Sequence, residues 1–368
     1  MATVELVNVS HSYNPPGTPD SERTWAVKDL SIVWEDGSAN ALLGPSGCGK
    51  TTLLNIISGL LPTPTRGKVL IDGRDVTGMK PRERGIAQVF QFPVVYDSMN
   101  VYDNLAFPLR NEGRPKAEVD AKVHEVAGIL GLEKMLRTHA TRLNPADKQK
   151  ISLGRGIVRE STAAVLLDEP LTVIDPKLKW GLRRQLREVQ RALGKTMIYV
   201  THDQHEALTF ADDVTVVRGG VLVQKGSPKD LHDDPSSPFI GYFIGSPGMN
   251  VLSCTLDDSG LNCGPFSIPV DAPIREHAAS AVGELELGIR PEFVQPRHAP
   301  DDESVAFTVS VIEDTGAYRI LTLRQGDMRI KARAANDFAV QEGDEIGVHF
   351  PQSGIKLFAG GKRLAAPD

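Results

Sequence analysis

The stretch GPSGCGKT (residues 44–51) follows a short apolar run, ALL (41–43), and precedes a helical stretch, TLLNIISGLL (52–61). A glycine-rich loop between a buried strand and a helix is the setting in which this pattern binds phosphate. Glycine lets successive backbone N–H groups turn toward an anion, and the helix start adds positive potential. The residues expected to contact a nucleotide are Gly44, Pro45, Ser46, Gly47, Cys48, Gly49, Lys50, Thr51 and Thr52.

Two side chains of this loop have distinct expected roles. Lys50 is expected to contact the β- and γ-phosphates of ATP, and the hydroxyl of Thr51 is expected to ligate Mg²⁺. Cys48 suits the loop by its small size. The predicted ligand is therefore ATP together with Mg²⁺.

A second motif, AAVLLDEP (163–170), is an apolar strand that ends in two adjacent carboxylates. Such a pair is costly at the end of a buried strand unless a cation is bound there. We expect Asp168 to hold Mg²⁺ and Glu169 to act as general base on the attacking water.

Polar residues also follow two further apolar runs. TMIYV (196–200) ends in THDQHEAL (201–208), which places His202 after a strand, and QVFQFP (88–93) places Gln91 in the same way. Because parallel strands bind ligands at their carboxyl edge, we expect His202 near Asp168 and Thr51. Gln91 is expected to reach the Mg²⁺ and the water.

The chain is predicted to be an α/β protein with an all-β addition. Over about the first 250 residues, short apolar runs alternate with helical patterns, which predicts a mostly parallel sheet. Its expected buried strands are 41–43, 164–167, 196–200 and 214–217, with a further strand near the N-terminus.

A helical subdomain is expected at about 92–160, where Val119, Val123, Val126 and Leu130 form an apolar stripe before Gly131. The segment 225–250, rich in Pro, Ser, Gly and Asp, predicts a domain boundary. Domains are therefore expected at 1–245 and 246–368, the second a small open β-barrel of the OB type with strands at 305–314, 318–326 and 344–350.

Composition excludes several function classes. The formal net charge of −6 argues against nucleic acid as a partner. The densest basic run, KLKWGLRRQLREVQR (177–191), carries Leu178, Leu182, Leu186 and Val189 at helical spacing, which favours an amphipathic helix with a solvated basic face. No apolar stretch is long enough to span a bilayer, and the three cysteines lack metal-ligand spacing. We expect a cytoplasmic protein with free thiols.

The order of phosphate loop, glutamine loop, DEP motif and THD motif resembles the ATPase subunit of an ATP-binding cassette (ABC) transporter. With LGIRPEFV (287–294) in the trailing β domain, the chain looks like the carbohydrate-importer branch, of the maltose and glycerol-phosphate type. The resemblance implies an ATPase at the cytoplasmic face of the inner membrane. It also implies two membrane-spanning permease subunits, an extracytoplasmic solute-binding protein, and a regulatory, dimerising C-terminal domain.

The same resemblance assigns further residues. Tyr13 is similar to the aromatic that stacks on adenine, and Trp25 is the rival because an insert (14–24) separates the two. Asp175 matches the aspartate of the loop that crosses the dimer interface, although Thr172-Val173 stands where the family usually has Ser-Asn or Ser-Ala. Gln91 and the FPVVYDSM that follows it would touch the coupling helix of a permease.

The chain departs from the family at the signature motif. The family's LSGGQ binds the γ-phosphate of the opposite subunit, whereas Leu143 here precedes Asn144, Pro145, Ala146 and Asp147. Proline lacks an N–H, and the aspartate would repel phosphate while capping its own helix. We therefore expect an asymmetric heterodimer in which a second ATPase subunit supplies the working signature. The segment most resembles one of the paired ATPase subunits of bacterial glycerol importers.

Three alternatives stay open at this point. The chain could form a homodimeric importer ATPase for another small solute. A soluble cassette ATPase of translation or DNA maintenance is less consistent, because such proteins usually carry two cassettes or a long coiled coil. A purely regulatory module would not need both Lys50 and Glu169.

Overall fold

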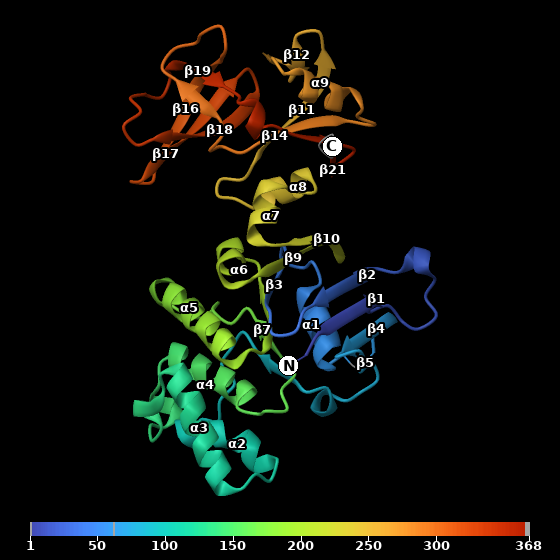
Figure 1. Ribbon diagram of the computed structural model, residues 1–368, viewed down its shortest axis with the longest axis vertical. Coiled ribbons are helices and arrows are strands. Elements are labelled where there is room, and N and C mark those ends of the chain that lie inside the picture. Colours follow the sequence, from blue (N-terminus) through green and yellow to red (C-terminus); the bar gives the residue numbers. More distant parts are fainter. Residues whose placement is uncertain (1, 62, 365–368) are drawn as a thin grey trace. The chain divides into compact units, whose positions relative to one another are not determined.

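The computed structural model describes residues 2–61 and 63–364 and is shown in Figure 1. The chain divides into two compact units, Met1–Pro228 and Lys229–Asp368. This division falls upstream of the domain boundary predicted at residue 245, which stays a prediction. Each unit has its own sheets and its own hydrophobic core.

A six-stranded sheet forms the centre of the first unit, in the order β10-β9-β3-β8-β7-β6. All neighbours pair in parallel except β9 and β10, which pair antiparallel. The bounds are β3 Ala39–Leu43, β6 Ile86–Val89, β7 Ala164–Asp168, β8 Thr196–Thr201, β9 Asp213–Arg218 and β10 Val221–Gly226. The predicted mostly parallel sheet is confirmed, including the four expected buried strands.

A second, antiparallel sheet has the order β2-β1-β4-β5. Its strands are β1 Val4–Ser12, β2 Trp25–Trp34, β4 Arg66–Ile71 and β5 Arg74–Asp75. Helix α1, Lys50–Ser58, shares one core with both sheets, because its leucine and isoleucine side chains pack with residues of β1, β2, β4, β7 and β8. The predicted helix over 52–61 is three residues too long at its C-terminal end, since Gly59 adopts a left-handed φ of 81° and ends it at Ser58.

Three helices pack together between β6 and β7 in the sequence: α2 Val101–Asn111, α3 Lys116–Leu130 and α4 Pro145–Ile157. The predicted apolar stripe of α3 is buried, and Gly131 caps the helix in the left-handed conformation. Short 3-10 turns, Glu133–Met135 and Ala140–Arg142, connect α3 to α4. These helices fall within the predicted helical subdomain of about 92–160.

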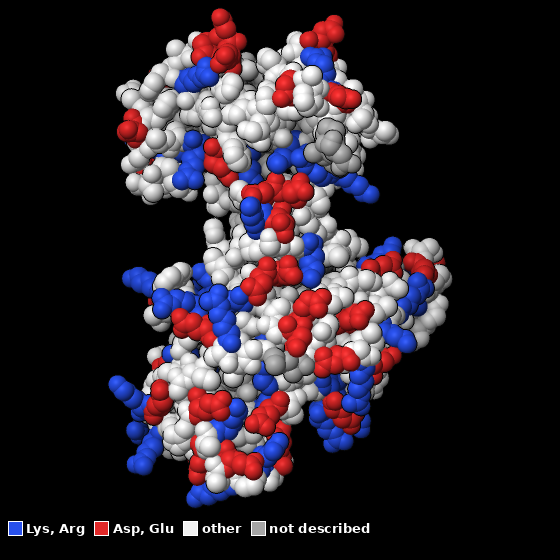
Figure 2. Space-filling view, in the orientation of Figure 1, with Lys and Arg blue, Asp and Glu red and all other residues white. Residues whose placement is uncertain are grey.

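Helix α5, Pro176–Leu193, is amphipathic as expected, and Figure 2 shows Lys and Arg gathered over it. Leu182, Leu186 and Val189 are buried, but Leu178 is 54 % exposed, so its assignment to the apolar face is wrong. Leu178 lies in the first turn of the helix. Helix α6, Gln204–Phe210, covers β3 and β8 and also contacts α5.

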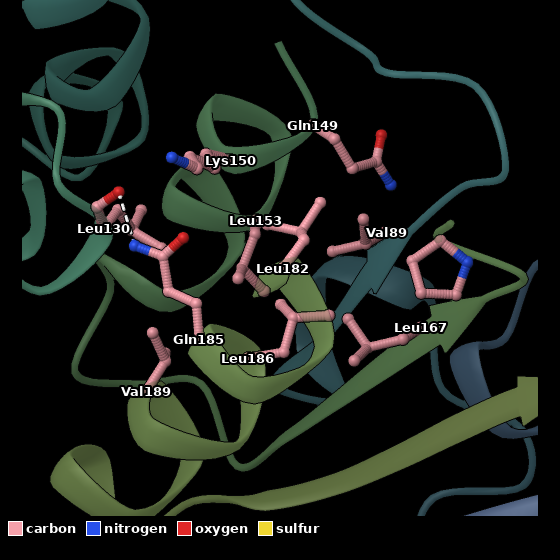
Figure 3. Close-up of a pocket in the computed structure, with 11 residues that line it drawn as sticks. Val89, Leu130, Gln149, Lys150, Leu153, Leu167, Leu182, Gln185, Leu186 and Val189 are labelled. Carbon is pink, nitrogen blue, oxygen red and sulfur yellow. Dashed lines mark hydrogen bonds between the residues drawn. The ribbon is translucent and has the colours of Figure 1, made fainter. Parts of the chain in front are cut away.

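Leu182 and Leu186 pack with Leu153 of α4 and with Val89 and Leu167 of the sheet (Figure 3). The gap among these side chains is about 10 Å³, at most the size of one water molecule, so this contact is a packed joint. Gln185 closes one side by donating a hydrogen bond to the carbonyl of Leu130 at 2.9 Å.

The second unit contains two antiparallel sheets, ordered β13-β12-β11-β14-β20-β21 and β15-β19-β16-β17-β18. A single core between them includes Leu252, Leu287, Phe307 and Val348. The bounds are β11 Asn250–Asp257, β12 Gly260–Asn262, β13 Ser267–Ile268, β14 Leu285–Ile289, β15 Gln295–Arg297, β16 Val305–Asp314, β17 Tyr318–Gln325, β18 Met328–Ala335, β19 Glu345–His349, β20 Lys356–Ala359 and β21 Lys362–Arg363. The predicted β architecture is confirmed, and a short helix that was not predicted, α9, Ala272–Ala279, lies between β13 and β14.

The segment predicted as a domain boundary, 225–250, includes the point at which the two units divide. It contains two short helices, α7 Pro228–Asp233 and α8 Pro238–Phe243. Arg290, which lies in the LGIRPEFV stretch, is buried and donates hydrogen bonds to the carbonyls of His232 and Ile244 at 2.6–2.9 Å. This arginine satisfies the helix-end carbonyls, which explains why the segment is ordered despite its composition.

Arg84 performs a similar task at the C-terminal end of α1. Its buried guanidinium donates to the carbonyls of Ile56 and Ile57 in the last turn of α1, and to those of Met79 and Thr77. Gly59 leaves the space for it, because a Cβ there would lie 2.6 Å from Nε of Arg84. A cation at a helix C-terminus also complements the helix dipole.

Replacing Arg84 should therefore destabilise the first unit. In Arg84→Met, several buried carbonyls lose their donor, and we expect a loss of about 3 kcal/mol in the free energy of unfolding. Arg82→Met is the matched control, since Arg82 is exposed and pairs only with its neighbour Glu83. Urea unfolding followed by circular dichroism measures both. Equal midpoints for the two variants would contradict the role given to Arg84.

Candidate functional site

The parallel register brings the ends of three strands to one edge of the sheet. Leu43 of β3 pairs with Thr201 of β8, and Asp168 of β7 pairs with Val200 of β8. The residues that follow these strands are therefore neighbours: the phosphate loop after β3, Glu169 after β7 and His202 after β8. This is the edge at which parallel α/β sheets bind their ligands.

The phosphate loop packs closely against backbone carbonyls of other segments at two of its glycines. A Cβ on Gly44 would lie 2.2 Å from the carbonyl oxygen of Val217, and one on Gly49 would lie 2.3 Å from that of Ala26. Gly49 also has a φ of 96° and precedes the first residue of α1, Lys50. No other residue type fits these two positions without displacing the backbone.

Lys50 is buried, and its ammonium group turns back onto the loop. Nζ donates to the carbonyl of Gly44 at 2.7 Å and to that of Pro45 at 2.9 Å, with the Cys48 sulfur 3.9 Å away. The loop carbonyls thus hold the cation in place and satisfy its donors. A phosphate group entering the loop would offer the same donors a charged acceptor.

Asp168, Glu169 and His202 lie together as predicted from their strand-end positions. Nδ1 of His202 is 2.9 Å from Oε1 of Glu169, and the hydroxyl of Thr172 donates to Oε2 at 3.2 Å. Burial and the adjacent charge of Glu169 raise the pKa of Asp168, and the Lys50 cation opposes this rise. Both oxygens of Glu169 are therefore oriented, one by the histidine and one by the threonine.

Glu169 has an unusual backbone conformation. Its φ of 43° lies in the left-handed region, which costs a non-glycine residue about 1–3 kcal/mol. Its N–H donates to the carbonyl of Val200 at 2.9 Å, which holds the strained turn against β8. A strained backbone at Glu169, whose carboxylate lies beside the phosphate loop, indicates that this residue has a functional role.

The donor set at this edge suits Mg²⁺. Mg²⁺ prefers oxygen ligands and usually takes one or two carboxylates together with phosphate oxygens and water. Asp168 supplies a carboxylate whose pKa is raised by burial and by the neighbouring Glu169 charge. The exposed hydroxyl of Thr51, in the first turn of α1, supplies a second oxygen.

Gln91 follows β6 as predicted, and the loop that contains it is hydrogen-bonded to helix α4. Gln149 donates to the carbonyl of Phe90 at 3.2 Å, and Arg155 donates to that of Val94 at 2.6 Å. No described contact joins the Gln91 side chain itself to Asp168 or Glu169. Its role toward Mg²⁺ and water stays a prediction.

The signature segment is capped by its own side chains. Asn144 is the N-cap of α4, and its Oδ1 accepts the N–H of Asp147 at 2.8 Å while its Nδ2 donates to Oδ2 of Asp147 at 2.8 Å. Pro145 is the first helical residue and has no N–H. Lys150 lies 3.6 Å from Oδ1 of Asp147. The helix end therefore presents a carboxylate where an anion-binding site would present open N–H groups.

Asp175 is exposed and caps α5, since its carboxylate accepts the N–H of Lys177 at 2.9 Å. Its place at a dimer interface stays a prediction. Among the described residues, sequence reasoning missed Glu206, a buried carboxylate that accepts hydrogen bonds from Tyr199 at 3.1 Å and Thr201 at 3.0 Å. The available signal was an acidic residue on the apolar side of a short helix, four positions after His202.

Tyr13 and Trp25, the two candidates for stacking on adenine, differ in whether other side chains already lie over their rings. Arg66 and Arg23 place their guanidinium carbons 5.5 Å and 5.8 Å from the centre of the Trp25 ring. Tyr13 is 65 % exposed, and its hydroxyl lies 3.1 Å from that of Thr52, next to the phosphate loop. The tyrosine is the better placed of the two to stack on a base.

The phosphate loop, the paired carboxylates and the histidine at one sheet edge define a nucleotide-hydrolysing ATPase. Comparison with known proteins agrees. The ABC transporter family profile matches residues 27–172, and the TOBE domain profile matches residues 287–358.

Full-length relatives are import subunits. The trehalose/maltose import ATP-binding protein of Thermococcus litoralis is 39 % identical over 97 % of this chain and 98 % of its own. The sn-glycerol-3-phosphate import ATP-binding protein of Psychromonas ingrahamii is 38 % identical over 97 % and 94 %. Among solved structures, CbiO1 of Clostridium perfringens, part of an ABC transporter complex, is 28 % identical, with a TM-score of 0.56 over 62 % of this chain and 89 % of that one. The chain belongs to the ABC transporter family, as an ATP-binding subunit with a C-terminal TOBE domain, and is an ATPase.

The stacking residue can be identified by nucleotide binding. We expect Tyr13→Ala to raise the Kd for ATP about tenfold, because base–aromatic stacking is worth about 1–3 kcal/mol. Trp25→Ala should change it by less than about threefold, since two arginines already occupy that ring. Isothermal titration calorimetry measures both, and the reverse order would assign the stacking to Trp25.

Proposed function

We propose that this chain is the ATP-hydrolysing subunit that energises the import of a carbohydrate or a polyol such as glycerol. The names of its full-length relatives, which import trehalose, maltose and glycerol 3-phosphate, support the class of solute. The observation that carries the chemistry is the hydrogen bond between His202 and Glu169 beside the phosphate loop.

In the proposed reaction, ATP enters the loop at residues 44–52 and Lys50 moves from the loop carbonyls to the β- and γ-phosphates. Glu169 accepts a proton from the attacking water, and His202 orients the Glu169 carboxylate from its other side. The left-handed backbone of Glu169 keeps this carboxylate in one position. Gln91 is proposed to orient the same water.

Mg²⁺ would be held by Thr51 and Asp168, with Gln91 as a further oxygen ligand, and supplies positive charge to the phosphate oxygens when bound. The buried carboxyl of Asp168 supports this assignment, because a bound cation would offset the burial that now raises its pKa. The positive charge of Lys50 already lowers the pKa of the Asp168 carboxyl.

Glu169→Gln tests the catalytic assignment. In the complex with its membrane partners, we expect ATP hydrolysis to fall by about 10²–10⁴-fold while ATP binding is retained, because the amide cannot accept the proton of water. Glu188→Gln is the control, since Glu188 is exposed on α5 and pairs with Arg184. Retained ATPase activity in Glu169→Gln would show that another group is the base.

The permease partners are proposed to dock at a groove of about 540 Å³ beside the glutamine loop. It is lined by Phe90, Val94, Phe107, Ser152, Arg155 and Arg159. Phe92 and Tyr96 add exposed aromatic surface next to it, and exposed apolar patches commonly mark binding sites. A helix of a membrane-spanning subunit fits such a groove.

The chain is proposed to lie at the cytoplasmic face of the inner membrane, held there by two permease subunits. The solute would reach them from an extracytoplasmic binding protein. Among the described residues, the structure contains no helix with both the length and the apolar character of a bilayer span.

We further propose that the chain acts in a heterodimer with a second ATPase subunit. The closed cap formed by Asn144 and Asp147, with Pro145 between them, supports this, because it leaves few donors for a partner's γ-phosphate. Of the two ATP sites in this heterodimer, the active one would combine this chain's phosphate loop with the signature motif of the second subunit. Asp175 would lie at the interface between the two subunits.

Restoring the signature tests the heterodimer. In a complex whose only ATPase subunit is this chain, Asn144→Ser, Pro145→Gly, Ala146→Gly and Asp147→Gln together should raise ATPase activity about 10²-fold. The gain follows from regained N–H donors and the removal of a carboxylate. Arg142→Gln, an exposed change just before the signature, should leave activity unchanged.

Full activity of the unaltered chain as the only ATPase subunit, with no gain on restoration, would favour the homodimer. That result would leave the ATPase assignment untouched.

A further inference from the structure

Two of the three cysteines lie opposite one another in the second unit. Strand β11 pairs antiparallel with β12, with Thr255 opposite Asn262 and Leu256 opposite Leu261. Continuing this register by one residue places Cys254 opposite Cys263. Both positions lie outside the segments that the two family profiles match.

The backbone hydrogen bonds show which kind of cross-strand pair this is. The N–H of Cys263 donates to the carbonyl of Phe266 at 2.9 Å, so it points toward β13 and away from β11. Cys254 and Cys263 therefore face each other as a non-hydrogen-bonded pair, for which Cα atoms lie about 4.5 Å apart. Disulfides usually join Cα atoms about 4.4–6.8 Å apart, so the two sulfurs can bond without a large backbone shift.

The two thiols already interact. The Cys263 thiol donates to the carbonyl of Leu261 at 3.8 Å. Its closeness to the Cys254 sulfur lowers the pKa of Cys254 and raises that of Cys263. The N–H of Leu287 on the neighbouring strand β14 lowers the pKa of Cys254 further, whereas burial and, to a smaller extent, the Glu286 charge raise it. Cys254 is also the more exposed of the two, at 7 % against 1 %. Cys254 is therefore the attacking sulfur.

A small molecule can reach the two buried thiols only when the nearby edge of the sheet opens locally. Strands β12 and β13 end the sheet order β13-β12-β11 and have only three and two residues. Short edge strands open locally at lower cost than a central strand does. Core packing around Phe266 and Leu285 keeps the thiols covered when the edge is closed.

We propose that Cys254 and Cys263 form a dithiol modification site, which low-molecular-weight disulfides such as glutathione disulfide oxidise to an intramolecular disulfide. The Cys254 thiolate attacks one sulfur of the small disulfide, its S–S bond breaks, and one glutathione leaves as the thiol. Cys263 then loses its proton and attacks the Cys254 sulfur, which releases the second glutathione. Two protein thiols are oxidised, and one small disulfide is reduced to two thiols.

Proximity makes the second step faster than the first. A thiol held opposite its target reacts at a high effective concentration, so the mixed disulfide at Cys254 should not accumulate. The bridge would fasten the β11–β12 hairpin covalently near its open end. Cys48, which is buried in the first unit's phosphate loop, has no comparable partner among the free cysteines.

The test treats the folded, reduced full-length chain with excess glutathione disulfide at neutral pH and follows intact mass and linked peptides. We expect a mass lower by two hydrogen atoms, one linked peptide pair containing positions 254 and 263, and reversal by dithiothreitol. Cys263→Ser should instead keep one glutathione at position 254. In Cys254→Ser, position 263 should react about tenfold more slowly than position 254 does in Cys263→Ser.

The proposal is wrong if the native chain keeps three free thiols, if it carries glutathione without forming the bridge, or if the bridge involves Cys48. Circular dichroism of both serine variants checks that they fold. Should either fail to fold, the native chain alone still decides between the bridge and its absence.

Discussion

The parallel pairing of β3, β8 and β7 determines where the chemistry of this protein lies. Each of these strands ends at the same edge, so the phosphate loop, the carboxylates and His202 become neighbours although about 150 residues separate them in the sequence. Arg84 and the close approach of Gly44 and Gly49 to other backbone segments then hold the loop and α1 in one conformation. The strained turn at Glu169 exists only because β8 supports it.

Helix α4 connects this edge to the proposed partners. Its first turn is the altered signature, Gln149 and, in the last turn, Arg155 hold the glutamine loop, and Leu153 packs on α5. A permease helix in the adjacent groove would therefore push on the same rigid element that faces the partner ATPase. In the proposed cycle, nucleotide binding and solute movement are coupled through α4. In the proposed heterodimer, the self-capped signature would make that coupling unequal at the two ATP sites.

Much of the first unit could be predicted from the sequence, because its phosphate loop and strand ends are local patterns with strict residue requirements. The expected parallel strands and the capped start of α4 are found where the sequence predicts them. Features that depend on distant partners could not be predicted. These include the antiparallel sheet of β1, β2 and β4 and the helices within 225–250. They also include the backbone carbonyls to which Arg84 donates hydrogen bonds and the left-handed turn at Glu169. Leu178 was misplaced for the same reason, since periodicity cannot show where packing begins.

Lys50 is held by the loop carbonyls, and we propose that it passes to the nucleotide at a site completed by Asp168, Glu169 and His202. The most direct measurement is a structure of the chain with a non-hydrolysable ATP analogue and Mg²⁺. We expect Nζ of Lys50 to leave the carbonyls of Gly44 and Pro45 for the β- and γ-phosphates, with Mg²⁺ at Thr51 and Asp168. Nucleotide bound in the loop while Lys50 stays on those carbonyls, or Mg²⁺ bound away from Asp168, would contradict it.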